Sequence, residues 1–274
     1  MKTYANVMIQ NEALILPYVY QYWKDYPIDK WVFYDDNSTD STVSVIKSLF
    51  GNHAIVIEGK REKFSESHNR SQMLELSRDN GAEFVLAIDA DELLSTSWVK
   101  NWETILKKNI EFDVKYYWYN VVGDIKTIRQ DPMYLHNYRT FLLPMSKTSK
   151  FDMNQFKYHT PRTPPVNLPS IQNKEAGVIH LQAINKRYYA LKQLWYKHYE
   201  YHTWNHSVEF INSRYDPVIN NMNFSEKSVP SHINDNINFN PDIYDEIEKV
   251  KGYKNYILKN TVEKLITFGR EYLK

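Results

Sequence analysis

Residues 84–92 read FVLAIDADE, an apolar run of strand length that ends in three acids within four residues. The run has no helical period, so it predicts a strand buried on both faces, as in a parallel sheet. Asp89 and Asp91 stand two residues apart, and in an extended chain this spacing points both side chains the same way. Because open α/β sheets bind ligands just beyond the carboxyl ends of their strands, we expect a ligand site here.

The D-x-D formed by Asp89 and Asp91 indicates a divalent metal. Two converging carboxylates make a hard oxygen site, which suits Mg²⁺ or Mn²⁺ holding substrate phosphates. In a chain this acidic a D-x-D also arises by chance, so the tripeptide alone is a weak signal. It is the only D-x-D in the sequence, and it ends the most apolar strand candidate, which favours a functional site.

The composition is that of a globular protein. The chain has 274 residues, of which 42% are hydrophobic and 24% charged, and this predicts one large domain with or without a C-terminal extension. A net charge of +1 gives no reason to expect a nucleic-acid partner. The chain has no cysteine, which excludes disulfides, thiolate catalysis and cysteine-ligated zinc.

The sequence predicts neither a signal peptide nor a transmembrane helix. The apolar residues near the start meet the polar residues Gln10, Asn11 and Glu12 too soon for a signal peptide, and no run is long enough for a transmembrane helix. We therefore expect a cytoplasmic protein, either free or peripheral to a membrane. Aromatic residues are frequent at 15%, which fits either sugar-binding surfaces or a codon bias toward Tyr, Asn and Lys.

Strands and helices alternate over about the first hundred residues, which predicts right-handed crossovers and a parallel sheet. The expected strands are 7–9, 31–34, 54–57 and 84–88, and the expected helices are 15–25, the segment after Asp40, and 67–80. Later elements are a helix at 97–109, strands at 114–122, 138–143 and 177–181, an irregular proline-rich loop at 144–173, a Tyr/Trp-rich helix at 187–206, and an amphipathic helix pair from Pro241 onward.

A second acidic cluster, DDNSTDST at residues 35–42, also follows a strand and precedes a helix. Ser38 and Asp40 are explained as turn and cap residues. Asp36 is not explained by capping, and a carboxylate at a strand end can accept hydrogen bonds from a nucleobase N–H and a ribose hydroxyl. The glycine and final glutamate of an EF-hand loop are missing, so a calcium loop is excluded.

The order of these motifs resembles a family 2-type glycosyltransferase of the GT-A fold, in particular its family 2-like group. The resemblance rests on Asn11-Glu12 before a helix, the D-N-S-T-D-x-T run, and D-A-D-E at 89–92, and it covers about residues 5–95. It implies an α/β fold with a Rossmann-like, mostly parallel sheet flanked by helices. We expect a GT-A domain at 1–200, with a nucleotide-binding half at 1–95 and an acceptor half at 96–200, and a helical C-terminal extension at 201–274.

The resemblance also implies roles for matched residues in binding a UDP- or GDP-sugar. Asp36 would contact the base, beside Asn11 and Glu12. Asp89 would hold the ribose, or the metal through water, and Asp91 would ligate Mn²⁺ or Mg²⁺. The residues with implied roles at the nucleotide sugar are Asn11, Glu12, Asp36, Asn69, Arg70 and Asp89. Glu92 is either an acid behind the metal ligands or a helix-start acid.

Beyond residue 100, His180 is the third metal-ligand candidate, because GT-A enzymes often complete the metal site with a late histidine and imidazole suits Mn²⁺. A structural histidine is the alternative. Arg187 or Lys186 could grip the diphosphate, although cations on a helix are usually solvated.

The general base is not marked by a clear motif. An inverting transfer needs a carboxylate that takes the acceptor proton. Asp124 and Asp131 are the candidates, with Asp152 further on, and His159 could line the acceptor side.

The sequence thus predicts a metal-dependent glycosyltransferase that moves a sugar to a glycan or other hydroxyl acceptor, with a homo-oligomer through the C-terminal helices as one option. The alternatives are a sugar nucleotidyltransferase, whose Gly-rich phosphate loop is missing, and a non-catalytic carbohydrate-binding protein.

Overall fold

The structure is a computed structural model that describes residues 1–59, 66–129, 137–150, 162–203, 207–220, 226–234 and 237–251. In chain order its first half contains β1 (Thr3–Ile9), α1 (Leu16–Trp23), β2 (Lys30–Asp35), α2 (Thr42–Phe50), the 3-10 turn η1 (Gly51–His53), β3 (Ala54–Glu58), α3 (Glu66–Asp79), β4 (Phe84–Asp89), β5 (Glu92–Leu94), α4 (Thr96–Lys100), α5 (Trp102–Glu111) and β6 (Asp113–Val122). The remainder contains β7 (Thr127–Arg129), β8 (Tyr138–Thr140), β9 (Leu142–Pro144), the 3-10 turn η2 (Met145–Lys147), β10 (Ser170–Ala183), α6 (Lys186–Thr203), α7 (Val208–Asn220), β11 (Glu226–Ser228), α8 (Ser231–Asn234) and α9 (Ile243–Lys251).

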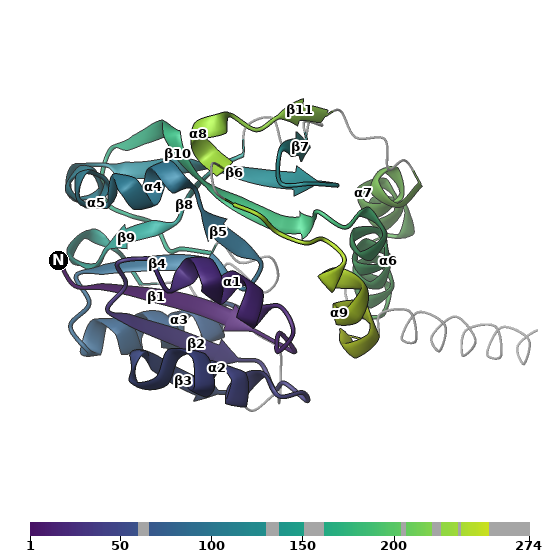
Figure 1. Cartoon of the computed structure of the whole chain (residues 1–274), viewed down its shortest axis with the longest axis horizontal. Coiled ribbons are helices and arrows are strands. Elements are labelled where there is room, and N and C mark those ends of the chain that lie inside the picture. The colour runs from purple at the N-terminus through teal and green to yellow at the C-terminus, as the bar shows by residue number, and fades with distance from the viewer. Residues whose placement is uncertain are drawn as a thin grey trace, which may run out of the picture.

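The first sheet has the strand order β3-β2-β1-β4-β9, in which the first four strands are parallel and β9 is antiparallel to β4. The chain order reverses at β1, which has β2 on one side and β4 on the other, so the carboxyl ends of β1 and β4 meet at a topological switch point. The predicted α/β fold with a mostly parallel sheet flanked by helices is confirmed (Figure 1).

Both faces of this sheet are covered, as the uninterrupted apolar strands predict. Val7 and Phe33 join a core with Trp23 and Phe50 of α1 and α2, whereas alternate residues of the same strands join a second core with α3. That second core contains Tyr4, Val32, Met73, Leu74 and Val85. The period-two alternation of the strands therefore places α1 and α2 on one face and α3 on the other.

The second sheet has the order β11-β7-β6-β10-β5, with β8 paired to β6. Its centre is the parallel pair of β6 and β10, and β10 is also antiparallel to β5. The register of β6 and β10 shifts before Gly177, where an added Cβ would lie 2.6 Å from the Tyr117 carbonyl oxygen. A glycine is required there because the neighbouring backbone approaches too closely for a side chain. Figure 1 shows this sheet beside the first, with α6, α7 and α9 gathered at one end.

Two predicted elements differ from the structure. The helix expected at 97–109 is two helices, α4 and α5, which are separated at Asn101. The strand expected at 138–143 is also divided. Its first part, β8, pairs with β6, but β9 joins the first sheet beside β4. Between them, the carbonyl oxygen of buried Phe141 accepts a hydrogen bond from the Ala87 N–H at 2.7 Å.

The end of the chain agrees in part with the amphipathic helices expected after Pro241. The structure has α9 at the start of that segment, and the second helix of the pair lies outside the described residues. None of the helices in the described ranges combines the length and the apolar character that crossing a membrane requires.

Candidate active site

The candidate site lies at the carboxyl edge of the first sheet. The strand register sets Ile9 beside Asp35 and Met8 beside Asp89, so the ends of three neighbouring strands stand in one row. The residue after β2 is also hydrogen-bonded to β1, because the Asp36 N–H donates to the Ile9 carbonyl at 2.8 Å. Asp36 is buried at the end of β2, and burial and the Asp36 charge both raise the pKa of Tyr34.

Two loops are joined beside Asp36. The Asn11 backbone N–H donates to Ser38 Oγ at 2.8 Å, and the Thr39 N–H donates to Asn11 Oδ1 at 2.7 Å. Asn11 has φ of +53°, a left-handed conformation that asparagine tolerates better than most residues. The predicted proximity of Asn11 and Asp36 is therefore present. Ser38 also contacts Asp35, which agrees with its predicted role in the turn.

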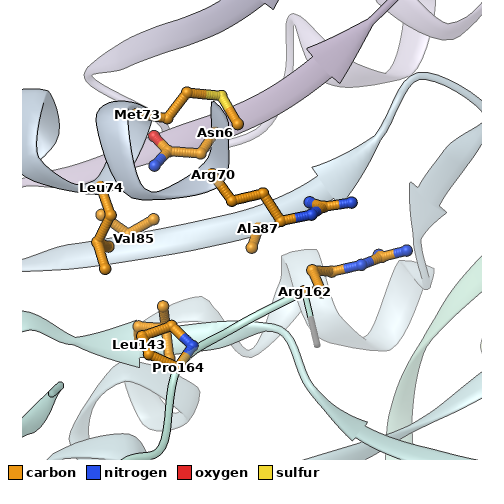
Figure 2. A pocket seen from close by; sticks show the side chains of 9 residues that line it. All are labelled: Asn6, Arg70, Met73, Leu74, Val85, Ala87, Leu143, Arg162 and Pro164. Carbon is orange, nitrogen blue, oxygen red and sulfur yellow. The ribbon is translucent and has the colours of Figure 1, made fainter. Parts of the chain in front are cut away.

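Asp89 is held by two arginines. Its Oδ1 lies 3.3 Å from Arg70 Nη2, and its Oδ2 lies 2.6 Å from Arg162 Nη2. Arg70 is also paired with Glu66 one turn earlier on α3, at 2.9 Å. Figure 2 shows both guanidinium groups extending past Ala87 of β4, from a pocket whose lining also includes Asn6, Met73, Leu74, Val85, Leu143 and Pro164. The arginines supply positive charge where the strand ends.

Glu92 lies beneath this cluster and is fully buried. Its carboxylate accepts hydrogen bonds from Trp118 Nε1 at 2.7 Å and from the Asp89 backbone N–H at 2.8 Å, and it is ion-paired with Arg162. The Arg162 guanidinium also stacks 5.0 Å from the Phe141 ring. Glu92 therefore fixes the turn that presents Asp89 and Asp91, which supports the interpretation of Glu92 as an acid behind the site.

Asp91 belongs to a different group of side chains. Its Oδ2 lies 3.5 Å from His180 Nε2 and 3.9 Å from Lys192 Nζ. His180 Nδ1 lies 2.7 Å from Asn120 Oδ1, and since an amide oxygen only accepts, Nδ1 carries the proton in this contact. The other ring nitrogen, Nε2, faces Asp91; it bears a lone pair when the ring is neutral and a proton when the ring is charged. The His180 ring is stacked on Trp118, with 4.4 Å between centroids.

The charges in this cluster shift one another's pKa values. Burial raises the pKa of Asp91, but His180 and then Lys192 outweigh burial and hold the pKa well below its ordinary value. For Asp89, burial is again opposed by Arg162 and Arg70, and the pKa is lowered. For Glu92, burial dominates over Arg162, and the pKa is raised. At neutral pH Asp89 and Asp91 are thus the ionised acids that face the edge.

The predicted metal ligands are not gathered as one set of three. Within the ranges that the structure describes, no group of three or more histidine and carboxylate side chains lies close enough to hold one metal ion. The reason is that Arg70 and Arg162 engage Asp89, whereas Asp91 faces His180. Asp91 and His180 nevertheless fit a cation, with a carboxylate oxygen and an imidazole lone pair on one side and an Asn120 contact that fixes the ring.

The remaining predicted residues fall into three groups. Asn69 and Arg70 are buried on α3, and Glu12 lies directly after Asn11, with its N–H bonded to Thr42 Oγ1 at 2.8 Å.

Arg187 is exposed in the first turn of α6, and Lys186 beside it is paired with Glu226 at 2.9 Å. Asp124 lies in an exposed turn after β6, where it accepts the Lys126 N–H. The predicted candidates that lie outside the described residues are Asp131, Asp152 and His159.

Sequence reasoning missed four residues that complete the site. Arg162 comes from the proline-rich segment, where no local pattern marks it. Lys192 lies on α6, between one and two turns after the predicted Lys186 and Arg187, and its side chain is 16% exposed. Trp118 and Asn120 alternate on β6, and their period-two spacing toward one face was the available signal.

The fold and the site define an α/β protein that carries two acids at the carboxyl edge of its parallel sheet, where folds of this kind bind ligands. The sequence model of the family described as glycosyl transferase family 2 matches residues 10–162, which is more than half of the chain. The chain belongs to glycosyl transferase family 2, and the prediction of a glycosyltransferase enzyme is confirmed at that level.

Solved structures that this chain resembles include TarS and a mannosyltransferase. TarS residues 1–349 from S. aureus is 13% identical, with a TM-score of 0.48, and the match covers 80% of this chain and 69% of that one. Mannosyltransferase PcManGT from Pyrobaculum calidifontis, solved with GDP-Man and Mn²⁺, is 12% identical, with a TM-score of 0.46 and coverage of 99% and 80%. Against the longer TarS structure, this chain spans 42% of the length. Comparison of the sequence with curated proteins gives no match.

Proposed function

We propose that the protein transfers a sugar from a nucleotide sugar to a hydroxyl group of an acceptor. The observation that carries the proposal is the placement of Asp89 at the end of β4 and of Asp91 just beyond it, next to the end of β1 and within the segment matched by the family. Ligands of open α/β sheets bind at this kind of edge.

The residues around the edge suit the parts of a nucleotide sugar. Asp36 and Asn11, at the ends of neighbouring strands, would hold the nucleoside through hydrogen bonds to the base and ribose. Arg70, Arg162 and Lys192 place three cationic side chains near Asp89 and Asp91. A diphosphate that enters would exchange carboxylate partners for phosphate partners on these cations, which suits a negatively charged leaving group.

Asp91 and His180 are the residues proposed to hold Mn²⁺ or Mg²⁺, with Asp89 nearby as ribose ligand or through water. Few protein ligands are needed, because such cations take much of their coordination from waters and substrate phosphates. When bound, the cation would neutralise negative charge that develops on the leaving diphosphate. His180 would bind the cation through Nε2, and its contact with Asn120 fixes the ring so that Nε2 faces Asp91.

We also propose which parts of the chain bind the acceptor and mediate self-association. Residues 96–200 would form the acceptor half and 201–274 a helical extension, with a glycan or glycosylated molecule as acceptor. An inverting transfer needs a base, and Asp124 and Asp131 remain the proposed candidates. The C-terminal helices are the proposed surface for self-association, and the protein is proposed to work in the cytoplasm, free or at a membrane surface.

A donor panel tests the proposal. We would measure binding and slow hydrolysis of UDP- and GDP-hexoses with Mn²⁺, with Mg²⁺ and with a chelator. UDP-GlcNAc, which is bound in another structure of TarS 1–349, and GDP-Man, which is bound in PcManGT, belong in the panel. Metal-stimulated release of a nucleoside diphosphate is expected for wild type. It should be lost in Asp91→Asn and kept in Asp79→Asn, the same change at the exposed end of α3. Binding of a glycan without any nucleotide response would support a carbohydrate-binding protein instead.

A further inference from the structure

One buried hydroxyl near the site has no role so far. Tyr244 of α9 is 2% exposed, and its hydroxyl is buried without a hydrogen-bond partner in the part of the chain that the structure describes. Leaving a polar group unpaired in the interior costs free energy, so such groups are rare and often mark a place where a ligand binds. Tyr244 also lies outside residues 10–162, the segment matched by the family.

The ring of Tyr244 is well anchored. It packs against Tyr188 of α6 with 4.7 Å between centroids, and against Phe239 at 6.1 Å. Phe239 in turn contacts Tyr18 of α1 edge-on at 6.3 Å. The ring therefore lies between α6 and the segment that approaches α1, which leaves only the hydroxyl unsatisfied.

Polar contacts fasten the same segment at both ends. Before α9, the Asn238 N–H donates to the Tyr22 hydroxyl at 3.1 Å, and that hydroxyl donates back to the Asn238 carbonyl. Within α9, Asn185 Nδ2 donates to Asp245 Oδ1 at 3.4 Å. Because α9 is held from α1 and from the start of α6, the Tyr244 hydroxyl has a fixed position. Figure 1 shows α9 against α6, at the end where the strands of the first sheet finish.

Tyr244 lies on the side of α6 that meets the site, because Tyr188, on which its ring packs, is one turn before Lys192, whose Nζ lies 3.9 Å from Asp91 Oδ2. Burial raises the pKa of Tyr244 well above its ordinary value, and the carboxylates of Asp91 and Glu12 raise the pKa further. The group is therefore a neutral hydrogen-bond donor at any physiological pH. Both carboxylates act on it from nearby, one after β4 and the other after β1, yet neither forms a hydrogen bond with it among the described residues.

The chemistry of this position selects a ligand. A phosphate oxygen only accepts hydrogen bonds, so it could accept from Tyr244 but would donate to neither Asp91 nor Glu12. A sugar hydroxyl both donates and accepts, so it can donate to a carboxylate of Asp91 or Glu12 and accept from Tyr244. It would give Tyr244 an acceptor and one of the two carboxylates a donor, and its neutrality incurs no repulsion.

We propose that the Tyr244 hydroxyl donates a hydrogen bond to a hydroxyl of the transferred sugar, so that α9 completes the donor site. The inference rests on the proposed function and adds a residue that contacts the sugar rather than the nucleotide. A protein site built to hydrogen-bond a hydroxyl discriminates against donors that lack it.

The test uses the full-length chain and two tyrosine variants. Tyr244→Phe removes the hydroxyl and keeps the ring that packs on Tyr188. Tyr116→Phe is the matched control, because the Tyr116 hydroxyl is equally buried but accepts the Asn109 amide at 2.6 Å in the core of the second sheet. For each protein we would measure the melting temperature without ligand. With Mn²⁺ present, we would also measure affinities for the best-bound nucleotide hexose of the donor panel and for its nucleoside diphosphate.

Tyr244→Phe should weaken binding of the nucleotide hexose about tenfold and leave the nucleoside diphosphate unchanged, without lowering the melting temperature. Tyr116→Phe should bind both ligands normally and melt a few degrees lower, since its hydroxyl is satisfied inside the fold. Equal losses for both ligands in Tyr244→Phe would overturn the sugar assignment, and so would unchanged binding or a lowered melting temperature. A wild-type protein that binds no nucleotide of the panel would refute the proposed function itself.

Discussion

Arg162 Nη2 lies 2.6 Å from Asp89 Oδ2, which joins the proline-rich segment after η2 to the last residue of β4. The same guanidinium is ion-paired with fully buried Glu92 and lies over the rings of Trp118 and Phe141. Its two acidic neighbours raise the pKa of Arg162 against the lowering effect of burial, so the charge is permanent. Arg162 is therefore the cation that allows two adjacent acids to remain close together in the interior.

Arg162→Ala is expected to lower the free energy of unfolding by roughly 3–5 kcal/mol, because it leaves the buried carboxylate of Glu92 without its ionic partner. Urea unfolding at neutral pH measures the loss. Arg139→Ala is the matched control, since Arg139 also stacks on Trp118, at 4.6 Å, but is exposed. The control should lose less than about 1 kcal/mol. Equal losses in the two variants would contradict a specific role for the Arg162 ion pairs.

The free energy of unfolding should fall at low pH, in part because Asp91 becomes protonated. Its pKa in the folded protein is held below the ordinary value, burial being outweighed by His180 and Lys192. A carboxyl with a depressed folded pKa stabilises the fold above its unfolded pKa, near 3.9, and this stabilisation is lost as pH falls toward the folded value. Unfolding measured from about pH 6 down to pH 3 should therefore show a shallower decline in Asp91→Asn than in wild type. Parallel pH curves for the two proteins would rule this contribution out.

The parts of the fold that follow local rules could be predicted from sequence. Residues 84–89 form the buried strand that their apolar run predicts, and Asp91 lies just beyond its end. The loop residues at Asn11 and Asp36 also lie together, because neighbouring parallel strands end at the same edge. These features depend only on strand periodicity and on the order of strands and helices.

Residues placed by long-range packing could not be predicted. Arg162 reaches Asp89 only because of the path that the chain takes after β9, and no periodicity encodes that path. For α6, the cations at its start were visible, but the face that turns toward Asp91 depends on how the helix packs. This packing directs Lys192 inward and leaves Arg187 exposed. The unpaired hydroxyl of Tyr244 likewise depends on where α9 docks.

Asp36 tests the assignment of the nucleoside end of the site. If its carboxylate accepts hydrogen bonds from the base or ribose, Asp36→Ala should weaken nucleotide binding about tenfold, with or without metal, because a single hydrogen bond is worth about 0.5–1.5 kcal/mol. Calorimetry with a nucleoside diphosphate, in Mn²⁺ and in a chelator, measures both conditions. An effect confined to the Mn²⁺ condition would assign Asp36 to the phosphate end and contradict the proposal.

The last prediction concerns the pair of Asn120 and His180, and it separates a metal ligand from a structural histidine. Asn120 Oδ1 holds the Nδ1 proton of His180 at 2.7 Å and so directs the Nε2 lone pair toward Asp91. Partners of this kind typically change metal affinity by 10–100-fold when they are removed. Asn120→Ala should therefore weaken Mn²⁺-dependent binding of a nucleoside diphosphate by at least about tenfold, with little change for a nucleoside that carries no phosphate.

Asn137→Ala provides the control for this variant. Asn137 is similarly buried, and its amide donates to the same Trp118 carbonyl, at 3.1 Å, to which the Asn120 amide donates at 3.2 Å. It has no contact with His180 among the described hydrogen bonds, so it should lose stability but keep its affinity for Mn²⁺. His180→Ala should lose the metal-dependent binding, because the imidazole proposed to ligate the cation is removed. A destabilised His180→Ala protein with normal Mn²⁺ affinity per folded molecule would show that His180 is structural.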